Sequence, residues 1–278
     1  MDPQPLPIRR LRFAYPDDFR AAWHPQKPEL ACAANAVSLL MPYAEPYLVR
    51  TVRSVLPQLD PNLCEEATGY VRQEASHHAQ HRRFNDLVAR EWAWVPRFER
   101  AIERVFGWLE RRSTAFGLAF AAGFECVAYN GARWTDRHLT ELFHGADPEP
   151  ATLFLWHLAE EVEHKTVAFD VQRAVGGKRS TYVLGLLTAL AVLAAFTVAG
   201  TLRGMASAGR LFSPVAHARL AKWAIGFWFL LAPPMIASAF AGHHPSQLAD
   251  PTVLPQWLRG YDAETGTMPA DTLAVLIG

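Results

Sequence analysis

The chain has little of what marks several large protein classes. Its cysteines are few and scattered, without a CxxC pair or the spacing of a zinc finger: Cys32, Cys64 and Cys126. An odd number of isolated cysteines argues against a disulfide framework and suits a reducing, cytoplasmic compartment. Lys and Arg together number 27, and Asp and Glu also number 27. The chain therefore lacks the basic excess of a nucleic-acid-binding protein, and no nucleic-acid partner is expected.

Several catalytic and targeting motifs are also missing. The sequence contains no GxGxxG, no P-loop, no GxSxG and no HExxH, which argues against the chemistries that depend on them. Without a flavin or nicotinamide motif, a redox reaction would need an external electron donor. Residues 1–28 are rich in proline and carry Arg9, Arg10 and Arg12, but no apolar stretch follows them. This segment is expected to be an irregular leader and not a signal peptide.

Helical patterns cover most of the remaining chain, whereas alternating strand patterns and Asn-Gly hairpin signals are lacking. Pro61 suits the first turn of one helix, and Gly176-Gly177 would close another. The spacing predicts helices over residues 29–56, interrupted near Pro42 and Pro46, and over residues 61–94, 96–112, 113–143 and 149–175. The expected fold class is all-α, with a helical bundle over residues 29–177.

Two segments near the C-terminus are long and apolar. Residues 180–202 and 223–242 contain no Asp, Glu, Lys, Arg or His, and each is as long as a membrane-spanning helix. Residues 178–278 are therefore expected to form an apolar helical hairpin followed by a tail of little periodicity. The hairpin either attaches the protein to a membrane or packs as buried helices, on the bundle or in a homodimer interface.

The connector between the two apolar segments bears on how the hairpin could insert. It holds four basic residues and no acidic one: Arg203, Arg210, Arg219 and Lys222. Two spans would place these charges outside, against the positive-inside tendency, if the rest of the chain is cytoplasmic. Pro233-Pro234 also interrupts the second segment. We therefore expect a hairpin that lies in one leaflet on the cytoplasmic side or forms a hydrophobic cap, with two spans as the second interpretation.

Two pairs of a glutamate and a histidine carry the strongest functional signal. Glu74-x-x-His77 and Glu161-x-x-His164 lie in separate predicted helices. Because a helix turns about 100° per residue, each pair shares one helical face. Two facing pairs of this kind, with one glutamate from each of two further helices, form the dinuclear metal site of ferritin-like four-helix bundles. The sequence therefore predicts a ferritin-like bundle around two metal ions.

Two isolated carboxylates can supply the remaining glutamates. Glu45 and Glu125 are each the only Asp, Glu, Lys, Arg or His within about twenty residues of apolar helical pattern. A buried carboxylate of this kind is costly unless a partner compensates its charge. His157 lies one turn before Glu161 on the same face and is a further imidazole candidate. The expected metal ligands are Glu45, Glu74, His77, Glu125, His157, Glu161 and His164.

Three further residues lie beside the predicted ligands. His81 shares the face of Glu74 and could be a ligand, an outer partner or a proton relay, and His78 could be an outer partner. These two histidines are the candidates for a catalytic role, while Glu160 is expected to point away from the site. The alternative is that both helices present ordinary solvated salt-bridge faces. The mixture of carboxylate and imidazole suits two iron ions, with manganese or zinc as alternatives.

Three stretches of the chain resemble a bacterial family described as predicted metal-dependent hydrolases. They cover residues 38–45, 73–85 and 156–170, and the resemblance extends over most of residues 30–260. The order of the ligands also looks like that of ferritin-like non-haem di-iron oxygenases. In particular, the spacing of His157, Glu161 and His164 is similar to the fourth helix of bacterial arylamine N-oxygenases. The similarity is confined to the ligands, so it does not imply an arylamine substrate.

These observations lead to three functional hypotheses. The first is a membrane-associated di-iron oxygenase or desaturase that oxidises a lipid-like or other hydrophobic substrate with O2 and takes electrons from an external donor. The second is a dinuclear metal-dependent hydrolase of esters or phosphoesters. The third is an iron-binding or iron-sensing relative of ferritin without enzymatic activity.

Overall fold

The chain is all-α, as the sequence predicts. The computed structural model describes residues 6–240 and 242–268, and within these ranges the only β-type pairing is an isolated bridge between Asp262 and Thr267. The α-helices of the described residues are α1 (Pro28–Ser38), α2 (Met41–Arg53), α3 (Pro61–Glu91), α4 (Val95–Leu109), α5 (Thr114–Asp136), α6 (Leu139–Phe143), α7 (Pro148–Glu163), α8 (Val167–Ala174), α9 (Arg179–Ser207), α10 (Pro214–Ala239) and α11 (Val253–Leu258).

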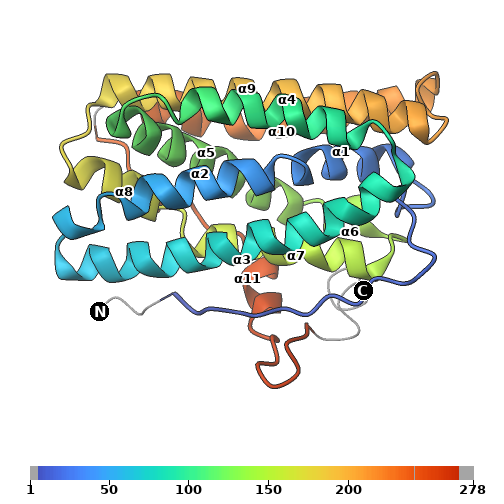
Figure 1. The fold of residues 1–278 in the computed structure, drawn as a ribbon, viewed down its shortest axis with the longest axis horizontal. Helices are drawn as coiled ribbons and strands as arrows, with labels where there is room; N and C mark the ends of the chain where they lie inside the picture. The colour runs from blue at the N-terminus through green and yellow to red at the C-terminus, as the bar shows by residue number, and fades with distance from the viewer. Residues whose placement is uncertain (1–5, 241, 269–278) are drawn as a thin grey trace.

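The long helices run roughly along one axis and enclose the core (Figure 1). Helix α3 packs against α2, α7 and α8, and α5 packs against the same three elements from the other side. Helices α9 and α10 lie along the upper edge of Figure 1, where α9 packs on α5 and α1. The candidate ligands of α2, α3, α5 and α7 therefore all face one interior space.

Local sequence signals explain where the central helices begin. The side chain of Asp60 accepts hydrogen bonds from the backbone N–H groups of Asn62 and Leu63, both at 3.1 Å, and Pro61 occupies the first turn of α3. The hydroxyl of Ser113 caps α5 in the same manner. These caps fix the register of two helices that carry site residues.

Three predicted boundaries were wrong. The break in the first helical region lies at Leu39-Leu40, while Pro42 sits in the first turn of α2 and Pro46 lies inside it. The helix predicted over residues 113–143 ends at Asp136. The helix predicted over residues 149–175 is interrupted after Glu163. Neither glycine nor proline occurs at this last break, so the sequence carries no local signal for it.

The interruption between α7 and α8 is stabilised by tertiary contacts. His164 leaves helical geometry, with φ −112° and ψ 20°, and its carbonyl accepts a hydrogen bond from the N–H of Val167 at 3.1 Å. The ammonium group of the next residue, Lys165, reaches the carbonyl of Leu248 and the carboxylate of Asp250. The turn carries the imidazole of His164 into the interior, where it faces the other candidate ligands.

The first described residues form an extended segment along α3 and α7, at the lower edge of Figure 1. The side-chain amide of Gln73 donates to the carbonyl of Pro7 at 3.0 Å, and that of Gln80 donates to the carbonyl of Leu11 at 2.9 Å. Arg9 of this segment forms ion pairs with two glutamates of α7. The segment therefore covers the bundle on the side away from α9 and α10.

Helix α9 approaches α5 closely because glycines face each other across the interface. A Cβ atom added to Gly185 would lie 2.3 Å from the backbone carbon of Ala119, and one added to Gly123 would lie 2.4 Å from the Cα of Leu186. Small residues that let two backbones approach in this way are common where apolar helices pack together. The inner side of the hairpin is thus fitted to the bundle.

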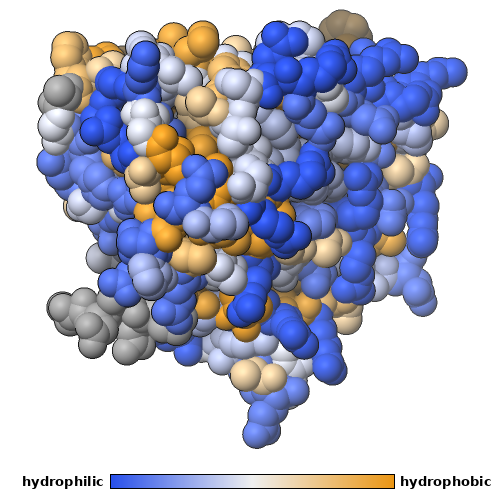
Figure 2. Space-filling view, turned by 60° about the vertical axis from the view of Figure 1, so that its left-hand side comes forward, coloured by the Kyte–Doolittle hydropathy of each residue, from blue (hydrophilic) through white to orange (hydrophobic). Residues whose placement is uncertain are grey.

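The outer side of the hairpin is apolar and largely uncovered. Helices α9 and α10 are long and apolar enough to cross a membrane, and only 22% and 17% of their most apolar windows are buried. Large apolar side chains are exposed on them, including Phe229 at 74% and Ile236 at 62%. Figure 2 shows hydrophobic side chains at the surface in the upper left of the view and in a patch left of its centre, while much of the rest of that face is hydrophilic. Within one chain these helices are therefore not fully buried on the bundle, while their burial in a homodimer interface or in a membrane stays a prediction.

Candidate metal centre

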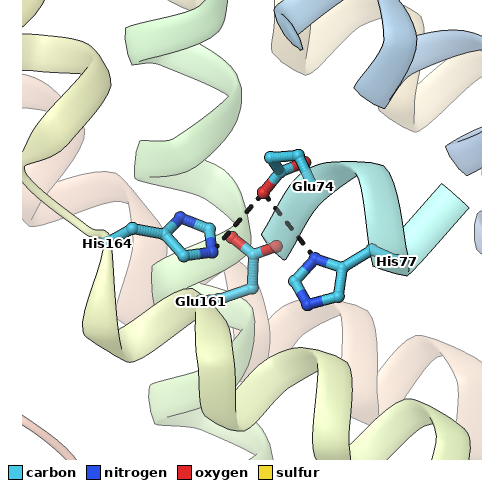
Figure 3. A group of neighbouring side chains, drawn as sticks. All are labelled: Glu74, His77, Glu161 and His164. Carbon is cyan, nitrogen blue, oxygen red and sulfur yellow. Dashed lines mark ion pairs between the residues drawn. The ribbon is translucent and has the colours of Figure 1, made fainter. Parts of the chain in front are cut away.

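Four predicted ligands from α3 and the end of α7 point toward one another in the interior (Figure 3). One ligand atom from each of Glu74, His77, Glu161 and His164 lies within 4.8 Å of the others, and all four side chains are buried. Glu74 Oε1 is 3.4 Å from His164 Nε2 and 3.7 Å from His77 Nδ1. The spacing and the donor types suit one metal ion held by two carboxylates and two imidazoles.

A second group of ligand atoms adjoins the first. Glu45 of α2, His81 of α3 and His157 of α7 also offer one atom each within 4.8 Å of one another. His157 Nε2 lies 3.6 Å from Glu45 Oε1 and 2.7 Å from Glu161 Oε1. Because Glu161 belongs to the first group and contacts the second, its carboxylate could take part in either group. The structure therefore brings two adjacent sets of ligands together.

The polar atoms that face this space fit a metal by another criterion. Buried polar atoms in proteins are normally hydrogen-bonded, and those without partners need an explanation. Six buried atoms of the cluster have no hydrogen-bond partner: Glu45 Oε1 and Oε2, Glu74 Oε1, His77 Nδ1, Glu161 Oε2 and His164 Nε2. All are potential ligands of a hard or borderline cation. Metal coordination would satisfy them where hydrogen bonding does not.

A chain of hydrogen bonds assigns the tautomer of His157. The amide nitrogen of Asn85 donates to the carbonyl of Ser38 at 2.9 Å, so Asn85 Oδ1 is the acceptor for the Ser38 hydroxyl at 2.6 Å. Ser38 Oγ then accepts from His81 Nδ1 at 2.8 Å, and His81 Nε2 accepts from His157 Nδ1 at 2.7 Å. The lone pair of His157 Nε2 is left facing the carboxylate of Glu161. A neutral lone pair opposite a carboxylate oxygen needs a proton or a cation between them.

This chain also indicates a role for His81. Its two ring nitrogens contact Ser38 and His157. His81 therefore supports the candidate ligand His157 through Nδ1 of His157, the ring nitrogen that faces away from Glu161. Burial lowers the pKa of His81 to about 3 and lowers that of His157 well below its usual value. Both rings are therefore neutral at physiological pH, as a metal ligand and its supporting acceptor must be.

His77 is oriented by a carboxylate that the sequence analysis placed away from the site. Its Nε2 atom lies 2.8 Å from Glu160 Oε2, and Glu160 in turn binds the guanidinium of Arg9 at 2.9 Å. His77 Nδ1 is left to face Glu74. Although burial opposes the charge, the hydrogen bond to Glu160 and the negative charge of Glu74 raise the pKa of His77 to about 10. Without a cation this ring carries a proton that metal binding would displace.

Glu125 occupies a corresponding position behind His164. Glu125 Oε2 lies 3.1 Å from His164 Nδ1, and Glu125 Oε1 accepts a hydrogen bond from the hydroxyl of Tyr70 at 2.8 Å. Both oxygens thus have partners, and Glu125 belongs to neither group of ligand atoms. Its position matches that of a carboxylate that orients a metal-binding histidine. Direct ligation by Glu125 stays a prediction.

The remaining carboxylates are strained electrostatically. Burial, followed by repulsion from neighbouring glutamates, raises the pKa of Glu45 and of Glu161 well above the usual value. Burial also raises the pKa of Glu74, although the nearby rings of His77 and His164 oppose it. Cations in this space would remove the repulsion and let the carboxylates ionise, so metal uptake is expected to release protons.

The alternative of solvated salt-bridge faces is wrong, because the glutamates and histidines of both groups are buried. His78 is not brought into either group: its ring bonds the carbonyl of Glu74 in its own helix at 3.1 Å. Its catalytic role stays a prediction. Four residues that support the cluster were not predicted from the sequence: Arg9, Ser38, Tyr70 and Asn85. Ser38 and Asn85 lie in two of the stretches that resemble the family, but helical periodicity does not connect their side chains to the ligands.

The comparisons with known proteins bear on the same region. A family model described as predicted metal-dependent hydrolase matches residues 7–249, which include every candidate ligand. No curated protein and no solved structure matches the chain. The resemblance noted from the three sequence stretches is thereby confirmed for the family, while the resemblance to di-iron oxygenases has no support from these comparisons.

Proposed function

The chain belongs to this family of predicted metal-dependent hydrolases, and from that premise we propose that it hydrolyses a hydrophobic ester or phosphoester with two metal ions bound in the buried cluster. The observation that carries the proposal is the pair of adjacent ligand groups, whose inward atoms lack hydrogen-bond partners. Bound divalent ions would polarise a carbonyl or phosphoryl oxygen and lower the pKa of water.

The residues of the chain have separable tasks in this proposal. Glu74, His77, Glu161 and His164 would hold one ion, and Glu45 and His157 would hold the second with Glu161 between them. Glu160 and Arg9 keep His77 in place, and Ser38 with Asn85 keep the lone pair of His157 turned inward. Glu45 has two oxygens without hydrogen-bond partners, so one could hold the ion while the other accepts a proton.

The exposed apolar surface suggests the class of substrate and the location. We infer that the outer face of α9 and α10 lies in one leaflet on the cytoplasmic side of a membrane, so that a lipid-like substrate can reach the protein. The connector supports this orientation, because Arg219 pairs with Glu29 of α1 at 2.9 Å and Lys222 pairs with Glu141 of α6 at 2.7 Å. These ion pairs hold the connector on the bundle, whereas two spans would carry it across the bilayer.

The orientation can be tested with a cysteine at Ser207, close to the connector. The residue lies at the end of α9, where its hydroxyl accepts a hydrogen bond from Trp94 at 3.1 Å. In Ser207→Cys cells, an impermeant thiol reagent should label the protein only after the cells are opened. Labelling of intact cells would establish a spanning hairpin. Full solubility of the purified protein as a dimer without detergent would overturn membrane attachment.

A second candidate function is an oxidoreductase that uses two iron ions, O2 and an external electron donor. The specific observation in its favour is the carboxylate content: Glu45, Glu74 and Glu161 among the ligand groups, with Glu125 adjoining them, can balance the charge of two ferrous ions. Carboxylate and imidazole ligands suit iron or manganese as well as zinc. The ligand set alone therefore does not select the reaction.

One experiment separates the two functions. The protein, reconstituted with zinc, manganese or ferrous iron under anaerobic conditions, is given a medium-chain p-nitrophenyl ester and bis-p-nitrophenyl phosphate. The hydrolase proposal expects metal-dependent cleavage without O2 or reductant, lost in Glu74→Gln and retained in Glu65→Gln, which changes an exposed residue of the same helix. If none of the metals supports cleavage and the ferrous protein consumes O2 instead, the hydrolase proposal fails.

A further inference from the structure

A second polar site lies outside the metal cluster, at the C-terminal end of α5. A cavity of about 490 Å³ opens there between α5, the second half of α10 and the segment after it. None of the residues that line it belongs to either group of candidate metal ligands. Arg133, at its edge, follows Glu125 by eight residues, which is roughly 12 Å along the helix axis. The cavity is therefore a separate feature of the fold.

The ionisable side chains that line this cavity are all basic. Arg133 lines it from the last turn of α5, Arg137 from the residue after that helix and His243 from the segment after α10, with no Asp or Glu among the lining residues. Among the described residues, neither guanidinium takes part in an ion pair with a carboxylate. Arg133 donates to the amide oxygen of Asn130 at 3.0 Å and lies over the ring of Tyr129. Two guanidinium groups without carboxylate partners favour an anionic ligand.

The other wall of the cavity is apolar. It is formed by α10, through Phe229, Leu230, Pro233 and Pro234. This wall continues into the exposed face of α10, because Phe229 lines the cavity and is also 74% exposed. A small inorganic anion would leave the apolar wall uncovered. An amphiphile can cover both parts, with its charged head at the arginines and its chain along α10.

We propose that this cavity binds the anionic head, a phosphate or carboxylate group, of an amphiphile whose chain lies against α10. The assignment is independent of the reaction at the metal cluster. It gives the hairpin a preferred lipid: an anionic head group at the arginines would fix the protein on the membrane beside its apolar face. An anionic, lipid-like substrate or product would present the same head group, and turnover distinguishes it from a membrane lipid.

Binding of dodecyl phosphate, below its micelle concentration, to the full-length protein tests the proposal by calorimetry. Dodecyl maltoside supplies the same chain without charge, and inorganic phosphate supplies the charge without the chain. The proposal expects dodecyl phosphate to bind more tightly than either. Arg137→Gln and Arg133→Gln should each weaken it roughly tenfold, as for a lost charge-assisted contact. Arg97→Gln, on exposed α4, should leave it unchanged.

Further variants keep the test decisive if an arginine variant folds poorly. Ala237 lines the cavity and is exposed, so Ala237→Trp should block binding by filling the space without a change of charge. Equal binding of dodecyl maltoside, equal binding of inorganic phosphate, or an equal loss in Arg97→Gln would each overturn the proposal. Two further assays distinguish an anchor from a substrate: binding to vesicles of phosphatidylglycerol, and hydrolysis of dodecyl phosphate by the metal-loaded protein. If the vesicles bind and dodecyl phosphate is hydrolysed, the ligand is a substrate as well as an anchor. Vesicle binding without turnover identifies an anchor alone.

Discussion

The metal cluster and the outer face of the hairpin depart from the usual distribution of side chains in opposite directions. In the cluster, glutamates and histidines that are normally exposed are fully buried, while on α9 and α10 aromatic and aliphatic side chains face outward. Buried charges without partners and large exposed apolar surfaces both lower the stability of a soluble protein. Each is therefore best explained by something that covers it: a cation in the first case and a lipid surface in the second.

The two regions are also stabilised differently. The cluster is surrounded by hydrogen bonds from distant parts of the chain, so its geometry depends on side chains such as Arg9 and Asn85. The hairpin is held mainly by close backbone packing at Gly123 and Gly185 and by ion pairs at its connector. A substitution in one region should therefore leave the structure of the other region intact.

The largest effect is expected from Glu74→Gln in the cluster. Glu74 Oε1 faces both His77 and His164, so loss of its charge should remove at least one metal ion per chain. Elemental analysis of the purified variant measures the loss, with Glu65→Gln on the exposed side of the same helix as the control. Full occupancy in Glu74→Gln would remove this residue from the ligand set.

The hairpin contact should respond next, through Gly185→Ala. The new methyl group would lie within 2.5 Å of the Ala119 and Phe120 backbone, and overpacking of this kind destabilises a protein by about 1–3 kcal/mol. Gly107→Ala is the matched control, because nothing lies within 4 Å of the added Cβ in α4 and the change should stabilise the helix by about 0.5–1 kcal/mol. Thermal unfolding of the metal-loaded protein measures both. Equal behaviour of the two variants would show that α9 does not pack tightly on α5.

A smaller effect is expected from Ser38→Ala, because Ser38 contacts the candidate ligand His157 only through His81. Loss of the hydroxyl removes the acceptor for His81 Nδ1 and frees the tautomers of both histidines. Metal affinity should fall roughly tenfold while the fold persists, as for other losses of an outer partner. Competition with a chelator measures the affinity. If the variant binds metal as tightly as the unchanged protein, the hydrogen-bond chain does not control His157.

The smallest effect concerns a buried histidine outside the cluster. His24 is as inaccessible as His77, yet burial and then the charge of Lys27 lower its pKa from 6.5 to about 4, whereas Glu160 and Glu74 raise that of His77. Between about pH 6.5 and pH 4, His24 binds a proton in the unfolded chain but not in the folded protein. The free energy of unfolding should therefore decrease as the pH falls from about 6.5 to about 4.

Denaturant titrations across this pH range measure the contribution of His24. The slope should become shallower in His24→Gln, where the titrating group is gone. His217→Gln, which removes an exposed histidine, is the control variant. An unchanged slope in His24→Gln would assign the acid sensitivity to other groups.

The sequence predicted the features of the site that depend on helical periodicity and on the local distribution of charge. Glu74, His77 and His81 share a face by spacing alone, and the lack of other charges around Glu45 indicated that it is buried. Contacts between distant segments could not be predicted in this way. Arg9 and Glu160 are 151 positions apart, and the break at His164 has no glycine or proline to mark it. Tertiary hydrogen bonds decided both, and they also gave Glu125 and Glu160 partners that local sequence does not show.

Anomalous diffraction from crystals of the metal-loaded protein tests whether the buried cluster holds two metal ions. Data collected on both sides of the metal's absorption edge locate the ions without reference to activity. The account predicts two peaks per chain, one among Glu74, His77, Glu161 and His164 and one beside Glu45 and His157. Crystals of protein exposed to zinc, manganese and iron that show no peak among these residues would contradict it.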